Sequence, residues 1–113
     1  MDEKKAILST CYGKPESLSA MITTQPNAIV SKTILHKPVG TITLFAFDAD
    51  QNLSEHTSPY DAVIQVLEGR ARVTIDGEPL TVQVGQMIVL PADVPHDVAA
   101  DEPFKMLLTM IRS

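Results

Sequence analysis

Cysteine is almost absent from this sequence, which carries a single one, Cys11, in 113 residues. A lone thiol excludes an intramolecular disulfide and a Cys-rich zinc site, and it suits a reducing compartment. No basic partner for Cys11 is evident in the sequence, so we expect a structural or incidental role rather than a catalytic one.

Long apolar runs are missing as well. No stretch reaches the roughly 18 residues that a helix needs to cross a bilayer. The opening residues, MDEKKAILS, carry charge but no apolar segment of signal-peptide length. We therefore expect a cytoplasmic protein that does not associate with membranes.

Basic residues are few and scattered, with nine Lys and Arg against 14 Asp and Glu, for a net charge of −5. A nucleic-acid-binding protein normally presents a basic stripe or patch to the phosphate backbone. We therefore expect no nucleic-acid partner.

The composition that remains, with 44% hydrophobic residues, is that of one globular domain spanning residues 1–113. Residues 1–27 are expected to form an N-terminal arm with one short amphipathic helix that ends before Pro26. The helix prediction depends on a proline and a glutamate suited to a first turn and on three apolar residues at helical spacing: Pro15, Glu16, Leu18, Met21 and Ile22.

Residues 28–113 change to short runs rich in Val, Ile, Thr and Phe, separated by segments with the Gly, Pro, Asp or Asn that turns require. These runs predict eight strands and an all-β fold. The clearest turn signal is Asp76-Gly77, which suits a type I′ hairpin. The expected strands are 28–35, 41–47, 61–68, 71–75, 80–84, 87–90, 96–100 and 104–111.

Two of these runs, DAVIQVLE at 61–68 and FKMLLTMI at 104–111, are apolar on both faces. A sheet with one solvated face does not need this pattern, so a second sheet, the arm or a second subunit must cover the outer face. We therefore expect a sandwich or barrel that forms a homodimer.

The stretch GQMIVLPADVPH resembles the second sequence motif of the cupins, in which a Gly, a Pro, usually a second Gly, and a His occur at fixed spacing. Gly85, Pro91 and His96 match the motif, and Asp93 stands where the family usually has its second Gly. The resemblance implies a double-stranded β-helix, that is, a jelly-roll-like barrel with its ligand site inside.

The stretch ending at Gly69 is similar to the first cupin motif. Counting back from that glycine places His56 at the first His position, Ser58 at the second, Ala62 at the Glu position and Asp50 at the leading Gly position. Fifteen residues separate Gly69 from Gly85, a spacer typical of small cupins of bacterial origin.

In metal-binding cupins the two His and the Glu of the first motif, with the His of the second, hold a divalent ion. By resemblance only His56 and His96 remain as candidate ligands for Zn, Fe, Mn, Ni or Cu, and two imidazoles alone make a weak site. Glu55 and His36 are candidate third ligands, whereas strand alternation directs Asp61 and Asp97 away from the interior.

Three methionines and three phenylalanines allow two interpretations. We expect them to fill the core, and the alternative is that they line a pocket for an apolar ligand. The residues concerned are Met87, Met106, Met110, Phe45, Phe47 and Phe104.

Several functions stay open at this point. The first is a binding protein that holds a small organic molecule in the barrel, with or without a divalent metal on the two histidines. The second is a metal-dependent enzyme of the oxygenase, isomerase or decarboxylase type with a nonstandard ligand set. A stand-alone relative of regulatory sensor domains, and an isomerase using a His base without metal, are also open. Arg70 and Arg72 are expected to face solvent, which disfavours the isomerase. No catalytic residue is assigned.

Overall fold

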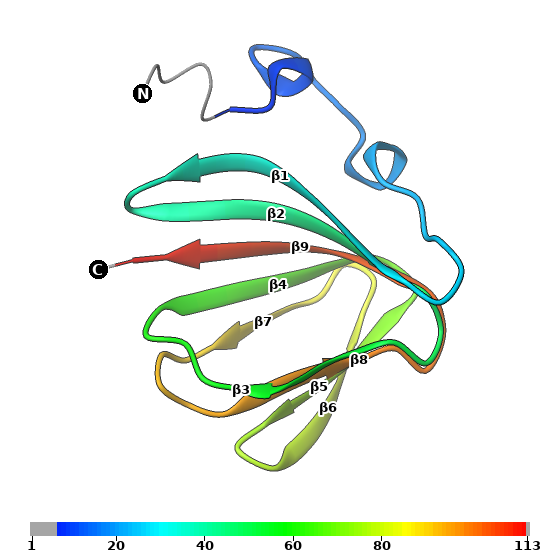
Figure 1. Cartoon of the computed structure of the whole chain (residues 1–113), viewed down its shortest axis with the longest axis vertical. Coiled ribbons are helices and arrows are strands. Elements are labelled where there is room, and N and C mark those ends of the chain that lie inside the picture. Colours follow the sequence, from blue (N-terminus) through cyan, green and yellow to red (C-terminus); the bar gives the residue numbers. More distant parts are fainter. Residues whose placement is uncertain (1–6, 113) are drawn as a thin grey trace.

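The computed structural model describes residues 7–112 and consists almost entirely of antiparallel β-strands (Figure 1). One sheet has five strands in the order β1-β2-β9-β4-β7, and the other has four in the order β3-β8-β5-β6. The strands are β1 Ile29–Lys37, β2 Gly40–Phe47, β3 Asn52–His56, β4 Asp61–Glu68, β5 Arg70–Ile75, β6 Glu78–Gln83, β7 Met87–Leu90, β8 His96–Ala99 and β9 Phe104–Ile111. The predicted all-β, jelly-roll-like fold is confirmed.

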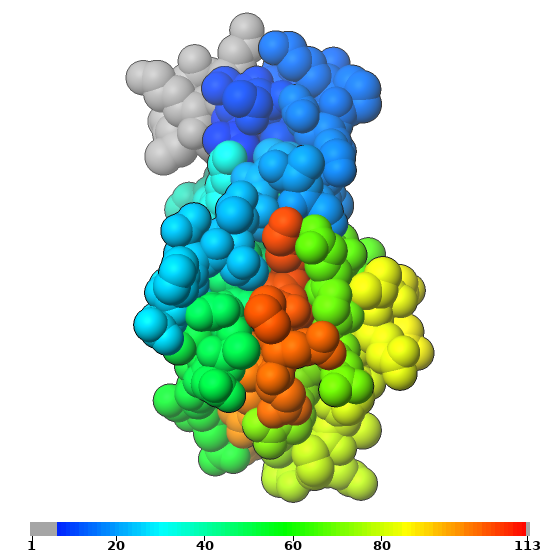
Figure 2. Space-filling view, turned by 90° about the vertical axis from the view of Figure 1, so that its right-hand side faces the viewer, coloured from blue at the N-terminus to red at the C-terminus, as the bar shows by residue number. Residues whose placement is uncertain are grey.

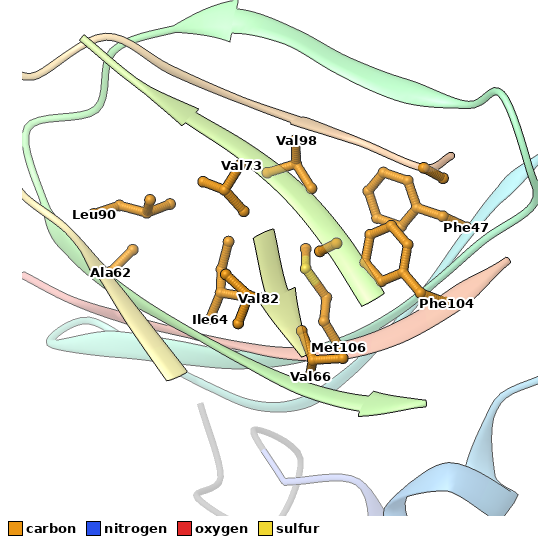
Figure 3. Close-up of a cluster of buried hydrophobic side chains, with 12 residues drawn as sticks. Phe47, Ala62, Ile64, Val66, Val73, Val82, Leu90, Val98, Phe104 and Met106 are labelled. Carbon is orange, nitrogen blue, oxygen red and sulfur yellow. The ribbon is translucent and has the colours of Figure 1, made fainter. Parts of the chain in front are cut away.

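The main core lies between the two sheets (Figure 3). At one end the rings of Phe47 and Phe104 stack with centroids 4.5 Å apart, and both side chains are fully buried. Ala62 and Leu90 lie at the opposite end of the cluster, and Val73 and Val98 lie on the small-sheet side (Figure 3). The sandwich therefore has an aromatic end and a second end with aliphatic side chains.

The predicted short N-terminal helix was wrong, because residues 15–22 form a single 3-10 turn, Leu18–Met21, and the other helical turn within residues 7–27 is the 3-10 turn Ser9–Cys11. The turn at Leu18–Met21 lacks a side-chain N-cap, and an isolated helix of this length is marginal in water. Ile22 is buried with Leu44 and Ala46 of β2 on the outer face of the large sheet. Leu18 and Met21 of this turn are partly buried against the same cluster, so the three apolar residues reach the sheet without a longer helix.

Lys105 of β9 links this arm to the large sheet through a hydrogen bond and also forms an ion pair within that sheet. Its Nζ donates to the carbonyl of Ser19 at 2.7 Å and pairs with the Glu68 carboxylate at 2.9 Å. The hydrogen bond from Lys105 holds the pKa of Glu68 below its ordinary value. The arm covers part of the large sheet at one end of the molecule, where Figure 2 shows it in blue.

One strand, β3, was not predicted from the sequence. Its residues Asn52–His56 are mostly polar and exposed, and its pairing with β8 is interrupted by a register shift between Leu53 and His56. Only Leu53 provides an apolar signal, so the alternation that identifies a strand is absent.

The predicted hairpin at Asp76-Gly77 is confirmed, since both residues have positive φ, 50° and 81°, and they join β5 to β6. Among residues 7–112, no helix is long and apolar enough to cross a membrane.

Candidate functional site

A cavity of about 160 Å³ lies between the sheets, at the end opposite the phenylalanine stack. Strands β4, β7 and β9 form its floor, and β3 and β8 form the facing wall. Its lining is apolar except for two histidines and a serine: Leu53, His56, Ser58, Ala62, Ile64, Leu90, His96, Val98, Met106, Leu108 and Met110.

His56 and His96 face each other at the polar side of this cavity. They are directly opposite in the β3–β8 register, and their ring centroids are 4.4 Å apart with an interplanar angle of 69°. His96 is buried, with 6% of its surface exposed, whereas His56 is exposed to solvent. The pair therefore lies where the cavity meets the surface.

Backbone carbonyls orient both imidazoles. His56 Nδ1 lies 2.6 Å from the carbonyl oxygen of Ser54, and His96 Nδ1 lies 3.0 Å from that of Val94. A carbonyl only accepts hydrogen bonds, so each neutral ring carries its proton on Nδ1. Each Nε2 then keeps its lone pair, and neither makes a hydrogen bond within residues 7–112. This tautomer can accept a hydrogen bond or ligate a metal.

The four positions that the motif register assigned to metal ligands meet in this one cavity. His56, Ser58, Ala62 and His96 all line it. The Ser58 hydroxyl accepts a hydrogen bond from the Tyr60 backbone N–H at 3.2 Å, which leaves its own proton available to be donated. The methyl group of Ala62 offers no donor atom to a metal.

The candidate third ligands lie elsewhere. Glu55 lines a separate groove on the outer face of the small sheet, together with Asp97, and His36 is an exposed residue of β1 paired with Thr41. Asp61 accepts a hydrogen bond from the Ala92 backbone N–H at 2.8 Å. No group of three or more His, Cys, Asp or Glu residues within 7–112 could hold a metal ion.

The residues present therefore do not complete the set of three protein ligands that a resident catalytic metal usually has. The histidine pair as a weak metal site stays a prediction.

Both departures from the motif glycines are explained by backbone geometry. Asp50 and Asp93 stand at glycine positions and have φ of 68° and 65°. Asp is one of the few residues other than Gly that adopts this left-handed region at modest cost. The Asp93 N–H donates to the Ser58 carbonyl at 2.7 Å, so this turn helps hold the segment that leads to the cavity.

A family model described as the cupin domain matches residues 43–111. The chain belongs to the cupin family. The match includes both motif histidines of this cupin and every strand from β3 to β9.

Solved structures agree with this assignment. A conserved protein of unknown function from Streptococcus pyogenes is 36% identical, with a TM-score of 0.85 and 88% of each chain covered. A cupin superfamily protein from Desulfitobacterium hafniense is 25% identical, with a TM-score of 0.84 over 88% of this cupin and 92% of that chain.

A cupin 2 conserved barrel domain protein from Leptotrichia buccalis is 38% identical, with a TM-score of 0.80 over 83% of this cupin. This cupin spans 46% of the length of that chain. No curated protein sequence matches significantly.

Two methionines of β9 have a double role that the sequence did not indicate. Met106, Phe47 and Phe104 belong to the core as expected, and Phe45 and Met110 pack against it, but Met106 and Met110 also line the cavity. Met87 does neither, because 56% of its surface is exposed. Residues 106, 108 and 110 share one face of β9 by strand alternation, but nothing in the sequence shows that this face is only partly filled.

Proposed function

We propose that this cupin binds a small organic molecule in the cavity between its sheets and does not itself turn that molecule over. The observation that carries the proposal is that Ser58 and Ala62 line the cavity at the positions where metal-binding cupins place the second His and the Glu. What remains is an apolar pocket with a polar rim, the usual composition of a ligand site. A cytoplasmic location is part of this proposal.

Methionine methyl groups give a direct test. We expect small organic fragments to shift the ¹³C-methyl signals of Met106 and Met110, which line the cavity, because a ligand there contacts both side chains. Met87 is exposed outside the cavity and serves as the internal control. The measurement is a fragment screen by methyl NMR on the full chain, and fragments that move only Met87, or no methionine, would contradict the proposal.

A second candidate function is a metal-dependent enzyme of the oxygenase, isomerase or decarboxylase type. It is favoured by the carbonyl contacts at both Nδ1 atoms, the arrangement that orients metal-ligating histidines in many proteins. It requires a ligand beyond His56 and His96 that residues 7–112 do not bring to the pair.

Metal content separates the two candidates. We expect the purified protein to contain far less than one Zn, Fe, Mn, Ni or Cu per chain by mass spectrometry, because two imidazoles without a carboxylate hold these ions weakly. Near-stoichiometric metal that is lost in both His56→Ala and His96→Ala, but kept in the control His36→Ala, would favour the enzyme.

A homodimer is the remaining part of the proposal. β7 is the last strand of the large sheet, and its residues Met87 and Val89 are 56% and 48% exposed. The opposite edge is different, because Ile7 bridges to Leu35 of β1. An exposed apolar sheet edge invites pairing, and a second copy can cover it about a two-fold axis.

Light scattering at micromolar concentration should therefore give twice the chain mass, and Val89→Lys should reduce it to that of one chain. Val39→Lys, at an exposed residue of the β1–β2 turn, should leave it unchanged. A monomeric mass for the unmodified protein would be enough to discard the dimer.

A further inference from the structure

The size of the cavity limits what it can hold. Its volume is about 160 Å³. A dry, apolar protein cavity of roughly 150 Å³ binds benzene, whereas drug-sized ligands occupy pockets of about 300 Å³ or more. The cavity therefore suits a single ring or a short branched chain, with room for one small substituent toward the histidines.

The chemistry of the walls limits the ligand further. The floor and far wall are formed by aliphatic and thioether side chains, including Ile64, Leu108 and Met110. No Lys, Arg, Asp or Glu is among the described residues that line the cavity. A charged ligand would lose its hydration without gaining a counter-ion, which makes its burial unfavourable.

The rim supplies both kinds of hydrogen-bonding partner. Nε2 of His56 and of His96 are acceptors, because Nδ1 of each ring is directed at a carbonyl. The Ser58 hydroxyl keeps a proton to donate, because its oxygen already accepts from Tyr60 N–H. A hydroxyl group is complementary to this set, since it can donate to an imidazole and accept from a serine.

We infer that the ligand is a neutral molecule of about benzene size, of roughly six to eight non-hydrogen atoms, that carries one hydroxyl group at the His56–His96 rim. The apolar body fills the space bounded by Ala62, Leu90 and the β9 side chains. This inference rests on the proposed binding function and specifies the class of molecule.

Four probes test it: phenol, benzene, benzoate and 2-naphthol, titrated into the chelator-treated full chain while the Met106 and Met110 methyl signals are followed. We expect phenol to bind at least about tenfold more tightly than benzene, because its hydroxyl gains hydrogen bonds at the rim. If the rim offered no partner, burial of the hydroxyl would make phenol bind more weakly than benzene. Benzoate and 2-naphthol should bind more than about tenfold more weakly than phenol, the first for its charge and the second for its size.

Histidine variants show whether the rim causes the preference. His96→Ala and His56→Ala should each reduce the phenol-to-benzene affinity ratio by about tenfold, since benzene makes no hydrogen bond that the substitution could remove. His36→Ala, on β1, should leave the ratio unchanged. Because His56 is exposed, its variant remains informative if His96→Ala is unstable.

The outcomes separate failure of the inferred ligand class from failure of the proposed binding function. Benzene binding as tightly as phenol, benzoate binding more tightly, or 2-naphthol binding equally well would each overturn the inferred class while leaving a ligand-binding cavity. A phenol preference that survives both histidine variants would also overturn it. If no probe and no fragment shifts Met106 or Met110, the proposed function fails with it.

Discussion

Gly69→Ala is expected to destabilise the fold by about 4 kcal/mol, a large part of the 5–15 kcal/mol typical of a domain. Gly69 is the single residue between β4 of one sheet and β5 of the other, and its φ is 69°. Alanine at this position would have to keep the left-handed backbone, which costs about 1–2 kcal/mol. Its Cβ would collide with the Pro103 carbonyl oxygen and the Phe104 side chain, which adds overpacking of roughly 1–3 kcal/mol.

Gly85→Ala is the matched control. Gly85 also has positive φ, 84°, but an added Cβ there would meet nothing within 4 Å. It should cost only the backbone term of about 1–2 kcal/mol. Urea unfolding of both variants gives the comparison, and equal losses for the two would show that the close approach to Pro103 is not what requires glycine at position 69.

Ala62→Leu is expected to abolish binding in the cavity without destabilising the fold. Ala62 lines the cavity and is 6% exposed, so three added carbons would enter empty space rather than displace neighbours. We expect a stability change between zero and a gain of about 1 kcal/mol, from added apolar burial. Phenol should no longer shift the Met106 and Met110 signals.

Ala71→Leu is its control, at a core position away from the cavity lining. Ala71 is fully buried in the same core cluster but does not line the cavity. The larger side chain should overpack the core and cost about 1–3 kcal/mol or more. Similar losses of stability for the two variants would mean that no usable space exists beside Ala62.

The fold could be predicted from the sequence where local chemistry determines the backbone. Asp76-Gly77 specified its turn because few residues accept positive φ, and Gly69 fixed the motif register that brings His56, Ser58 and His96 to one cavity. The departures at Asp50 and Asp93 looked like mismatches in the sequence. Both have a left-handed backbone, the conformation that glycine adopts most readily.

Other features depend on tertiary contacts and could not be predicted in this way. β3 presents polar residues because its outer face lines the groove with Glu55, so no apolar alternation identifies it. The arm shows helical spacing, but contact with Leu44 and Ala46 is achieved by a single 3-10 turn. Strand parity predicts which face a donor occupies, yet it could not show whether Glu55 or His36 reaches the histidine pair.

The uneven filling of the sandwich has a thermodynamic consequence. The side chains that line the open end have no packing partners across the cavity, so this end of the sandwich contributes less to stability than the end filled by Phe47 and Phe104. A molecule that binds only the folded chain raises the free energy of unfolding by RT ln(1 + [L]/Kd). The melting temperature of this cupin should therefore rise with the concentration of its ligand, which makes heat resistance in a cell extract a measure of occupancy.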